Sequence, residues 1–524
     1  MEPSRISREA LVAILLLCLL GIAMTVTNPY FSFMDDELAI LQGATAPIHQ
    51  TLQDFLQGAG HHRHPPLYDL VLALWMRVTG GRVALLRVPA TVFYLLGLWF
   101  VILSAGLAGG PRAARFALGI GLVFPYGFHF GRIAGWYSFS FLTLALVTYA
   151  YLRVVQQPGW GRWALLVFSA LLAVYANYFL LPMLGLLAFD YWLGHRDHPV
   201  KSLAAAGGTL LVVLAGFYPL LHALLFRVAI DQEILRPVFS AKATALFGIY
   251  NLYTIFVSES VAPWFWLLSL PAVAAIAFCA FSLMRYGPSS ARALFLAFLG
   301  CMLAMTLLNL INTKRLLFLS PWLLISLAVM LANLPRPSIQ RVAAGTLALI
   351  GAIGWFGIVS RQFYAAPRLV EPWPSVAGEV AREVQKGAVV IGNNPSFFFY
   401  LTEAIRSDAG QRRFAGIYPV VLRHPRLFNP DQWLEKGKSL GRTTLLVKGA
   451  ADETLWAPTA EAQRYLDQAC HVDTVRREMQ DTGFAWKQRW YPTLRQPEWR
   501  IEIRTYACND GNETAAQLHN EPGE

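Results

Sequence analysis

Three consecutive carboxylates, Asp35, Asp36 and Glu37, follow the first apolar segment of the chain. Acidic side chains close to lipid are costly, so a functional role is the first interpretation to consider. A carboxylate can act as a general base that accepts the proton of an incoming hydroxyl group. The competing interpretation is a solvated loop without chemistry. The pattern therefore indicates acid–base chemistry at these residues, and it leaves open whether Asp35 or Asp36 is the base.

His61, His62, Arg63 and His64 lie further along the same polar stretch. Three histidines could bind a metal ion, but so short a tract is weak evidence for one. A divalent metal usually needs carboxylates from more than one segment, and the second outer loop, around residues 131–133, contains none. We therefore favour hydrogen bonding and phosphate contact over a metal site, and we expect no cofactor, although a divalent metal is not excluded.

Several basic residues lie in segments that the topology below assigns to the outer side of a membrane. They are Arg63, Arg77, Arg82, Arg87, Arg132, Arg227, Arg236, Lys242, Lys314 and Arg315. Basic residues normally collect on the inner side, so these exceptions need a reason. One reason is an anionic ligand such as a phosphate at headgroup depth, for which we expect Arg63, Arg132, Lys314 and Arg315. The other is simple anchoring to lipid headgroups.

The composition is typical of a polytopic membrane protein, with 524 residues of which 56% are hydrophobic and 14% charged. The net charge of +11 does not indicate nucleic-acid binding, because of where it lies. Residues 1–364 carry 23 Lys and Arg against 12 Asp and Glu, whereas residues 365–524 carry 20 of each. The excess therefore belongs to the apolar part of the chain, where basic loops set membrane topology.

We predict about eleven transmembrane helices, each needing roughly 20 apolar residues. They lie at about 10–27, 84–108, 113–130, 134–155, 163–179, 180–194, 203–226, 262–284, 292–311, 316–334 and 341–360. With the N-terminus in the cytoplasm, every inner loop then carries a pair of basic residues, as the positive-inside rule expects. An odd number of spans places the C-terminal tail outside, in the periplasm or its equivalent. The long segment 227–261 is expected to be an outer loop.

The first outer loop, residues 28–83, is expected to hold two helices that do not cross the membrane. Residues 65–80 are apolar but short for a crossing, and counting them as a span would reverse every later loop. We interpret them as a juxtamembrane helix at the outer interface, with Tyr68 and Trp75 at a suitable depth. Thr51–Leu56 is expected to form another short helix.

The tail, residues 365–524, has the alternating helix and strand pattern of a small α/β domain. Helices are expected at 376–385, 395–405 and 459–470, and strands at 388–392, 443–448 and 500–507. Cys470 and Cys508 are expected to form a disulfide if the tail lies in an oxidising compartment. The predicted domains are therefore 1–364 in the membrane and 365–524 outside it.

Taken together, the sequence motifs of this chain resemble those of the GT-C superfamily of membrane glycosyltransferases. The resemblance rests on Asp36-Glu37 after the first span, His64–Tyr68 before the interfacial helix, and Leu86–Pro89 at the start of the next span. It covers most of residues 10–360, and the nearest families are the family 39 protein O-mannosyltransferases and the lipid A aminoarabinose transferase. Later parts of the same pattern are Arg132–Arg153, Val174–Phe179 and Lys314–Pro321.

The resemblance implies an enzyme that moves a sugar from a polyprenyl-phosphate donor to a lipid, glycan or protein hydroxyl at the outer membrane face. It places the catalytic acid on Asp36 beside Glu37, and phosphate contacts on His64 and Arg87. It also implies a metal-independent reaction that inverts the anomeric centre. Asp35 is an addition to the family pattern. The alternatives are a multi-pass lipid or sugar transporter or flippase, and a scaffold that recruits partners through its tail.

Overall fold

A computed structural model of the chain describes residues 8–33, 35–45, 47–56, 65–234, 241–307, 313–364, 370–406, 426–435, 440–449, 457–480 and 499–508. The chain divides into two compact units. Unit 1 comprises residues 1–28, 46–79 and 83–365, and unit 2 comprises 29–45, 80–82 and 366–524. Residues 29–45, which the sequence analysis assigned to the first outer loop of the membrane domain, therefore pack with the tail in unit 2.

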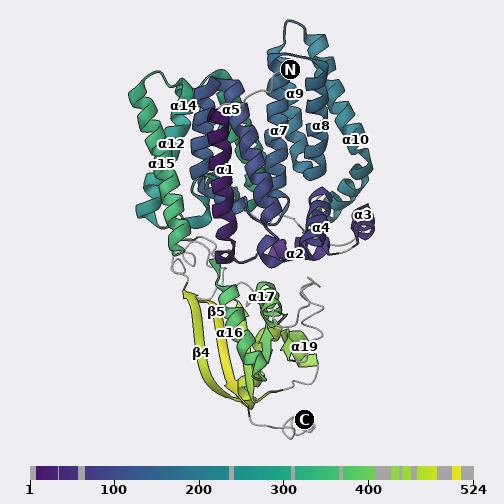
Figure 1. Cartoon of the computed structure of the whole chain (residues 1–524), viewed down its shortest axis with the longest axis vertical. Coiled ribbons are helices and arrows are strands. Elements are labelled where there is room, and N and C mark those ends of the chain that lie inside the picture. The colour runs from purple at the N-terminus through teal and green to yellow at the C-terminus, as the bar shows by residue number, and fades with distance from the viewer. Residues whose placement is uncertain are drawn as a thin grey trace. The chain divides into compact units, whose positions relative to one another are not determined.

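Unit 1 is a bundle of apolar helices that run alongside one another (Figure 1). The longer ones are α1 (Arg8–Val26), α5 (Val88–Val123), α7 (Trp136–Gln156), α8 (Trp160–Ala176), α9 (Leu181–Gly194), α10 (Pro199–Ile234), α12 (Trp266–Tyr286), α13 (Ser289–Leu307), α14 (Ser320–Asn333) and α15 (Pro337–Ser360). Within the described residues, eight helical stretches are long and apolar enough to cross a membrane. The chain is therefore a multi-pass membrane protein.

Helix α5 is two antiparallel helices joined by a sharp reversal. At Gly110 the backbone has φ 76° and ψ −175°, and Pro111 follows. A Cβ atom at Gly121 would lie 3.0 Å from Leu98 Cδ2. Residues 98 and 121 would be about 35 Å apart in one straight helix, so the two halves must lie side by side. The predicted break between residues 108 and 113 is thereby confirmed.

Each of the eleven predicted spans coincides with a helix or with half of α5. Helices α8 and α9 are apolar but shorter than the eight stretches that are long enough to cross a membrane. The number of membrane crossings therefore stays a prediction. The expected outer loop 227–261 holds the end of α10, which continues to Ile234, and α11 (Ala241–Val257). The place of this segment on the outer side stays a prediction.

The two expected short helices of the first outer loop are present as α3 (Ile48–Leu56) and α4 (Leu67–Thr79). With 13 residues, α4 is only about 20 Å long, which is too short to cross a membrane. It ends at Gly80, whose φ of 67° gives the left-handed conformation that commonly terminates helices. Tyr68 is buried against Phe93 and Phe139 rather than placed at an exposed interface.

Unit 2 combines a small α/β domain with one helix from the N-terminal region (Figure 1). In chain order its elements are α2 (Asp35–Ala44), α16 (Trp373–Gln385), β1 (Val389–Gly392), α17 (Pro395–Arg406), β2 (Leu427–Phe428), α19 (Pro430–Glu435), β3 (Thr443–Gly449), α20 (Ala457–Ala469), β4 (His471–Gln480) and β5 (Trp499–Ala507). The sheet order is β2-β1-β3-β5-β4. Pairs β1–β2 and β1–β3 are parallel, whereas β3–β5 and β4–β5 are antiparallel.

Every helix and strand that the sequence predicted in the tail is present. Strand β4 was not predicted, because its sequence is mostly polar and it lies at the edge of the sheet, where one side is unpaired. The core beside the sheet contains Trp433, Leu446, Leu466 and Tyr506. A disulfide joins Cys470 and Cys508, with a Cα–Cα distance of 4.5 Å, and so ties the end of α20 to the residue after β5.

Candidate active site

The three predicted acids form the first turn of α2, which begins at Asp35. The N-terminus of a helix has a partial positive charge, so carboxylates are stabilised there. Glu37 is fully buried. Leu38 and Leu41 are also buried, which gives α2 an apolar face. The side chains of Asp35 and Asp36 lie outside the part of the structure that is described, so their role as base stays a prediction.

The segment that precedes these acids is held by α17. The backbone N–H of Phe33 donates to Tyr400 Oη at 3.1 Å, and its carbonyl oxygen accepts from Ser396 Oγ at 2.8 Å. The Phe33 ring packs edge-on against Phe399, with ring centroids 5.1 Å apart. All four residues belong to unit 2. Both backbone groups of Phe33 are therefore fixed just before α2 begins.

Within unit 1, Arg132 holds the end of α1. It is 1% exposed, and its Nη1 donates to the Met24 carbonyl oxygen at 3.1 Å and to Thr27 Oγ1 at 2.8 Å. Its Nε donates to the Phe128 carbonyl oxygen at 3.1 Å, and its guanidinium carbon lies 4.2 Å from the centroid of the Phe128 ring. Arg132 thus donates to one carbonyl oxygen in the last turn of α1, where the helix leaves carbonyl groups without partners of its own. A phosphate contact by Arg132 stays a prediction.

A buried polar cluster in unit 1 surrounds Arg132. The Nδ1 atom of His129 and the Oγ atom of Ser258 are 2.7 Å apart, and both residues are buried. The Tyr364 ring meets the His129 ring edge-on at a centroid distance of 5.4 Å. Arg132 and Arg87 both lie within range of a charge interaction with His129.

The sequence analysis did not identify His129, Ser258 or the neighbouring Glu259. Glu259 lies near Tyr126 and Tyr364, which adds an acid to the cluster. Ser258 has φ 64°, a left-handed conformation that a non-glycine residue adopts only where its surroundings impose it. The available signal was the polar Ser-Glu-Ser sequence set between apolar residues on both sides. An arrangement of arginine, histidine and hydroxyl groups can bind an anion and supply hydrogen bonds to it.

The remaining predicted residues are distributed as follows. Arg87 is 1% exposed and is the residue before α5, in unit 1. Arg315 is half-buried in the 3-10 segment Thr313–Leu319, and the Lys314 side chain lies outside the described residues. Residues 57–64, with all three histidines and Arg63, also lie outside them. The described residues contain no group of three or more His, Cys, Asp or Glu that could hold a metal.

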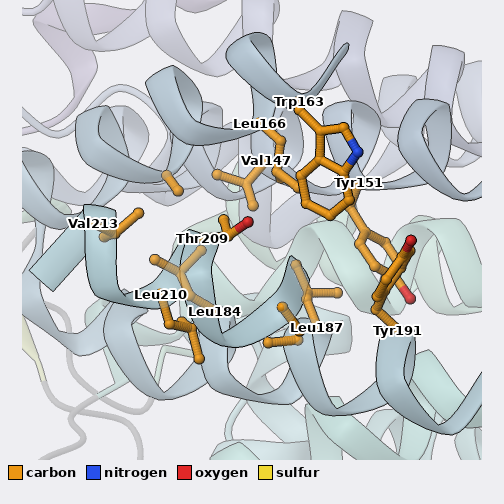
Figure 2. Close-up of a pocket in the computed structure, with 13 residues that line it drawn as sticks. Val147, Tyr151, Trp163, Leu166, Leu184, Leu187, Tyr191, Thr209, Leu210 and Val213 are labelled. Carbon is orange, nitrogen blue, oxygen red and sulfur yellow. The ribbon is translucent and has the colours of Figure 1, made fainter. Parts of the chain in front are cut away.

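A separate apolar cavity lies in unit 1 between α7, α8, α9 and α10 (Figure 2). Its volume is about 430 Å³, including the part that is open to the surroundings. Trp163, Tyr151 and Tyr191 gather at one end of it (Figure 2), and the Tyr151 hydroxyl donates to the carboxylate of Asp190. None of the predicted site residues lines this cavity, so it is not part of the candidate active site.

Comparison with known proteins identifies the class to which this fold belongs. Residues 63–222 match the family model for dolichyl-phosphate-mannose-protein mannosyltransferases. No curated protein matches the sequence. The family-model match covers less than half of the chain. The likenesses to the two ArnT structures below show a shared fold, which agrees with the resemblance of the sequence motifs to the GT-C superfamily.

The most extensive likenesses are to two crystal structures of ArnT from Cupriavidus metallidurans. The structure bound to undecaprenyl phosphate is 12% identical, with a TM-score of 0.53, and the match covers 95% of this chain and 98% of that one. The apo structure is 13% identical, with the same TM-score and coverage. A looser likeness, at 12% identity and a TM-score of 0.44, is to the Archaeoglobus fulgidus oligosaccharyltransferase tethered with an acceptor peptide, covering 77% of this chain and 63% of that one.

Proposed function

We propose that this protein transfers a sugar from a polyprenyl-phosphate donor to a hydroxyl group of a cell-envelope acceptor. The acceptor would be lipid A or a related glycolipid, a polysaccharide, or an exported protein. The observation that carries the proposal is the likeness in fold, over 95% of the chain, to a protein crystallised with undecaprenyl phosphate. The family model over residues 63–222 gives independent support for sugar transfer.

In the proposed reaction Asp36 is the general base. It accepts the proton of the acceptor hydroxyl as that oxygen attacks the anomeric carbon of the sugar. The bond between the anomeric carbon and the phosphate oxygen breaks, and the lipid phosphate leaves with the electron pair. A single displacement of this kind inverts the anomeric centre, and it needs no metal if cations stabilise the leaving phosphate.

The proposed phosphate ligands are His64, Arg63, Arg87, Arg132, Lys314 and Arg315. For Arg87 and Arg132 the support is their burial in unit 1, within range of a charge interaction with His129. We further propose an inner-membrane location with the N-terminus in the cytoplasm and the C-terminal domain outside. The Cys470–Cys508 disulfide supports this orientation, because structural disulfides persist in oxidising compartments.

Mass spectrometry of envelope glycolipids and exported proteins tests the proposal. Cells lacking the protein would be complemented with the wild-type chain, Asp36→Asn, Asp35→Asn or Asp197→Asn. Asp197 is an exposed acid outside the proposed site and serves as the matched control. We expect Asp36→Asn to lower the amount of sugar-modified product at least about 100-fold, within the range that general bases contribute. Asp197→Asn should match the wild-type chain, and the missing mass would identify the sugar and its acceptor.

Full modification by Asp36→Asn with loss in Asp35→Asn would move the base to Asp35. Full modification by both variants would remove these acids from the mechanism. A flippase predicts a different result. Without the protein, the lipid-linked sugar would accumulate on the cytoplasmic face, with its mass unchanged. Detection of that accumulation would contradict a transferase.

A further inference from the structure

The C-terminal domain fixes the chain at the two residues that lead into the acidic turn. Besides the two backbone hydrogen bonds of Phe33, Ser32 Oγ donates to the carbonyl oxygen of Glu371 at 2.5 Å, and this contact is buried. Ser32 and Phe33 lie three and two residues before Asp35. Their partners are more than 330 residues away in the sequence but belong to the same compact unit.

Glu371 is itself held by a buried ion pair. Its Oε1 accepts from Arg500 Nη2 at 2.6 Å and from Arg500 Nε at 3.0 Å. Its Oε2 accepts from Trp373 Nε1 at 2.8 Å. Glu371 is 6% exposed and Arg500 2%. A buried carboxylate with three charge-assisted or aromatic N–H donors has little freedom to move, so the carbonyl oxygen that receives Ser32 is fixed as well.

The C-terminal domain also contacts α2 itself. Helix α2 packs against α17, the same helix that supplies Ser396 and Tyr400. Leu38 and Leu41, three positions apart, are 2% and 0% exposed and form one apolar face. Residues of the C-terminal domain therefore hold the chain before α2 and also contact the helix itself.

We infer that the C-terminal domain positions the acidic turn of α2 for catalysis. Ser396, Tyr400 and Glu371 are positioning residues, which act on the reaction through the backbone of Ser32 and Phe33. The inference rests on the proposed function in that it takes the acidic turn as the site of the base. Catalysis is sensitive to such placement, because a misplacement of about 1 Å by a distant mutation can cost about 100-fold in rate.

The test compares variants of unit 2 that each remove a single hydroxyl group and its hydrogen bond. Tyr400→Phe removes the acceptor for the Phe33 N–H, and Ser396→Ala removes the donor to its carbonyl oxygen. Tyr506→Phe is the matched control, because the Tyr506 hydroxyl donates to Asp467 at 2.8 Å in the core beside the sheet. Each variant of the full-length chain is expressed in membranes, and the rate of appearance of sugar-modified product is measured.

We expect Tyr400→Phe and Ser396→Ala each to lower the transfer rate about threefold to tenfold, the range for loss of one hydrogen bond. The double variant should lose about 10- to 100-fold. Tyr506→Phe should stay within about twofold of the wild-type rate. Binding of undecaprenyl phosphate to the purified chain, measured by native mass spectrometry, should be the same in all variants, since the proposed phosphate ligands in the described residues belong to unit 1.

Hydrogen exchange gives a readout that does not depend on activity. Amides of residues 35–44 should exchange faster in Tyr400→Phe and Ser396→Ala, and at the wild-type rate in Tyr506→Phe. Wild-type transfer rates in the double variant would overturn the inference. If the wild-type chain itself shows no transfer that depends on the acidic turn, the proposed function fails instead. In that case unchanged exchange of residues 35–44 in the double variant would still overturn the positioning role.

Discussion

The helical bundle of unit 1 and the sheet domain of unit 2 satisfy their buried polar groups differently. In the bundle, Ser140, Thr148 and Ser326 each donate a hydroxyl hydrogen bond to the carbonyl oxygen four residues earlier in the same helix. In the sheet domain, Arg500 pairs with Glu371, and Lys448 pairs with Glu502 at 2.7 Å, all with little exposure. Neutral groups of a helix can thus be satisfied locally, whereas these ion pairs join distant segments.

This difference indicates what each unit depends on for stability. The bundle depends on close helix packing, which in a membrane takes the place of the hydrophobic effect. The sheet domain depends on paired charges and on a disulfide. Changes that unbalance charge should therefore unfold the sheet domain while the bundle remains folded. The four predictions below test this contrast from the largest expected effect to the smallest.

Removal of Arg500 should have the largest effect. Arg500→Met leaves the Glu371 carboxylate buried without its ion-pair partner, so we expect the free energy of unfolding of the sheet domain to fall by about 3–5 kcal/mol. Pulse proteolysis of the full-length chain at increasing urea measures this, with fragments of the bundle followed in parallel. The double variant Arg500→Met/Glu371→Gln removes both charges and should recover much of the loss. Equal losses in single and double variants would refute the charge argument.

Loss of the disulfide should cost somewhat less. Cys470 and Cys508 are 38 residues apart in sequence, and opening a loop of that length costs about 2–4 kcal/mol, mainly through the unfolded state. Cys470→Ser with Cys508→Ser should therefore lower the urea midpoint of the sheet domain only. Cys279→Ser in the bundle is the control. Alkylation of unreduced membranes reports the oxidation state in cells, and reduced cysteines at both positions would place the domain in a reducing compartment.

Acid should weaken the sheet domain through Glu502. Burial opposes ionisation of Glu502, but hydrogen bonds from Lys448, Arg504 and Arg477 outweigh it and lower the pKa from 4.5 to about 2. Because the folded pKa is below the unfolded one, the stabilisation is complete above about pH 4.5 and is lost as the pH falls toward 2. The loss should reach at most about 3 kcal/mol. Glu502→Gln should flatten this part of the pH profile, and an unchanged profile would contradict it.

Adding a methyl group at a close contact between two helices should have the smallest effect on stability, and this effect should be confined to the bundle. A Cβ atom at Gly97 would lie 2.4 Å from Phe141 Cδ1, so Gly97→Ala should destabilise the contact between α5 and α7 by about 1–3 kcal/mol. Gly119, also in α5, has no atom within 4 Å of such a Cβ. Gly119→Ala should be neutral or stabilising by up to about 1 kcal/mol. Thermal unfolding in detergent compares the two, and equal midpoints would contradict the packing argument.

The sequence correctly predicted the membrane class, helices at the eleven expected spans, and three helices and three strands of the tail. Apolar runs of sufficient length, ended by glycine and proline at Gly110-Pro111, mark helices locally, and strands such as β3 are marked by consecutive β-branched and aliphatic residues. It missed α11, whose apolar run is short, and β4, whose residues are polar. Helix α11 forms because it packs against other helices, and β4 because it pairs with β5, which no local pattern records.

The sequence by itself also identified the acids at residues 35–37. It identified, too, the basic residues that the predicted topology places on the outer side, against the positive-inside rule. Those residues are recognisable because charge beside an apolar segment is rare and costly. Only the tertiary structure decided that Arg132 satisfies the end of α1, that His129 meets Ser258, and that Phe33 is held by Ser396 and Tyr400. These contacts join segments between about 100 and 370 residues apart. Hydrogen bonds depend on distances within a few tenths of an ångström, and sequence spacing carries no information on them once the chain folds back on itself.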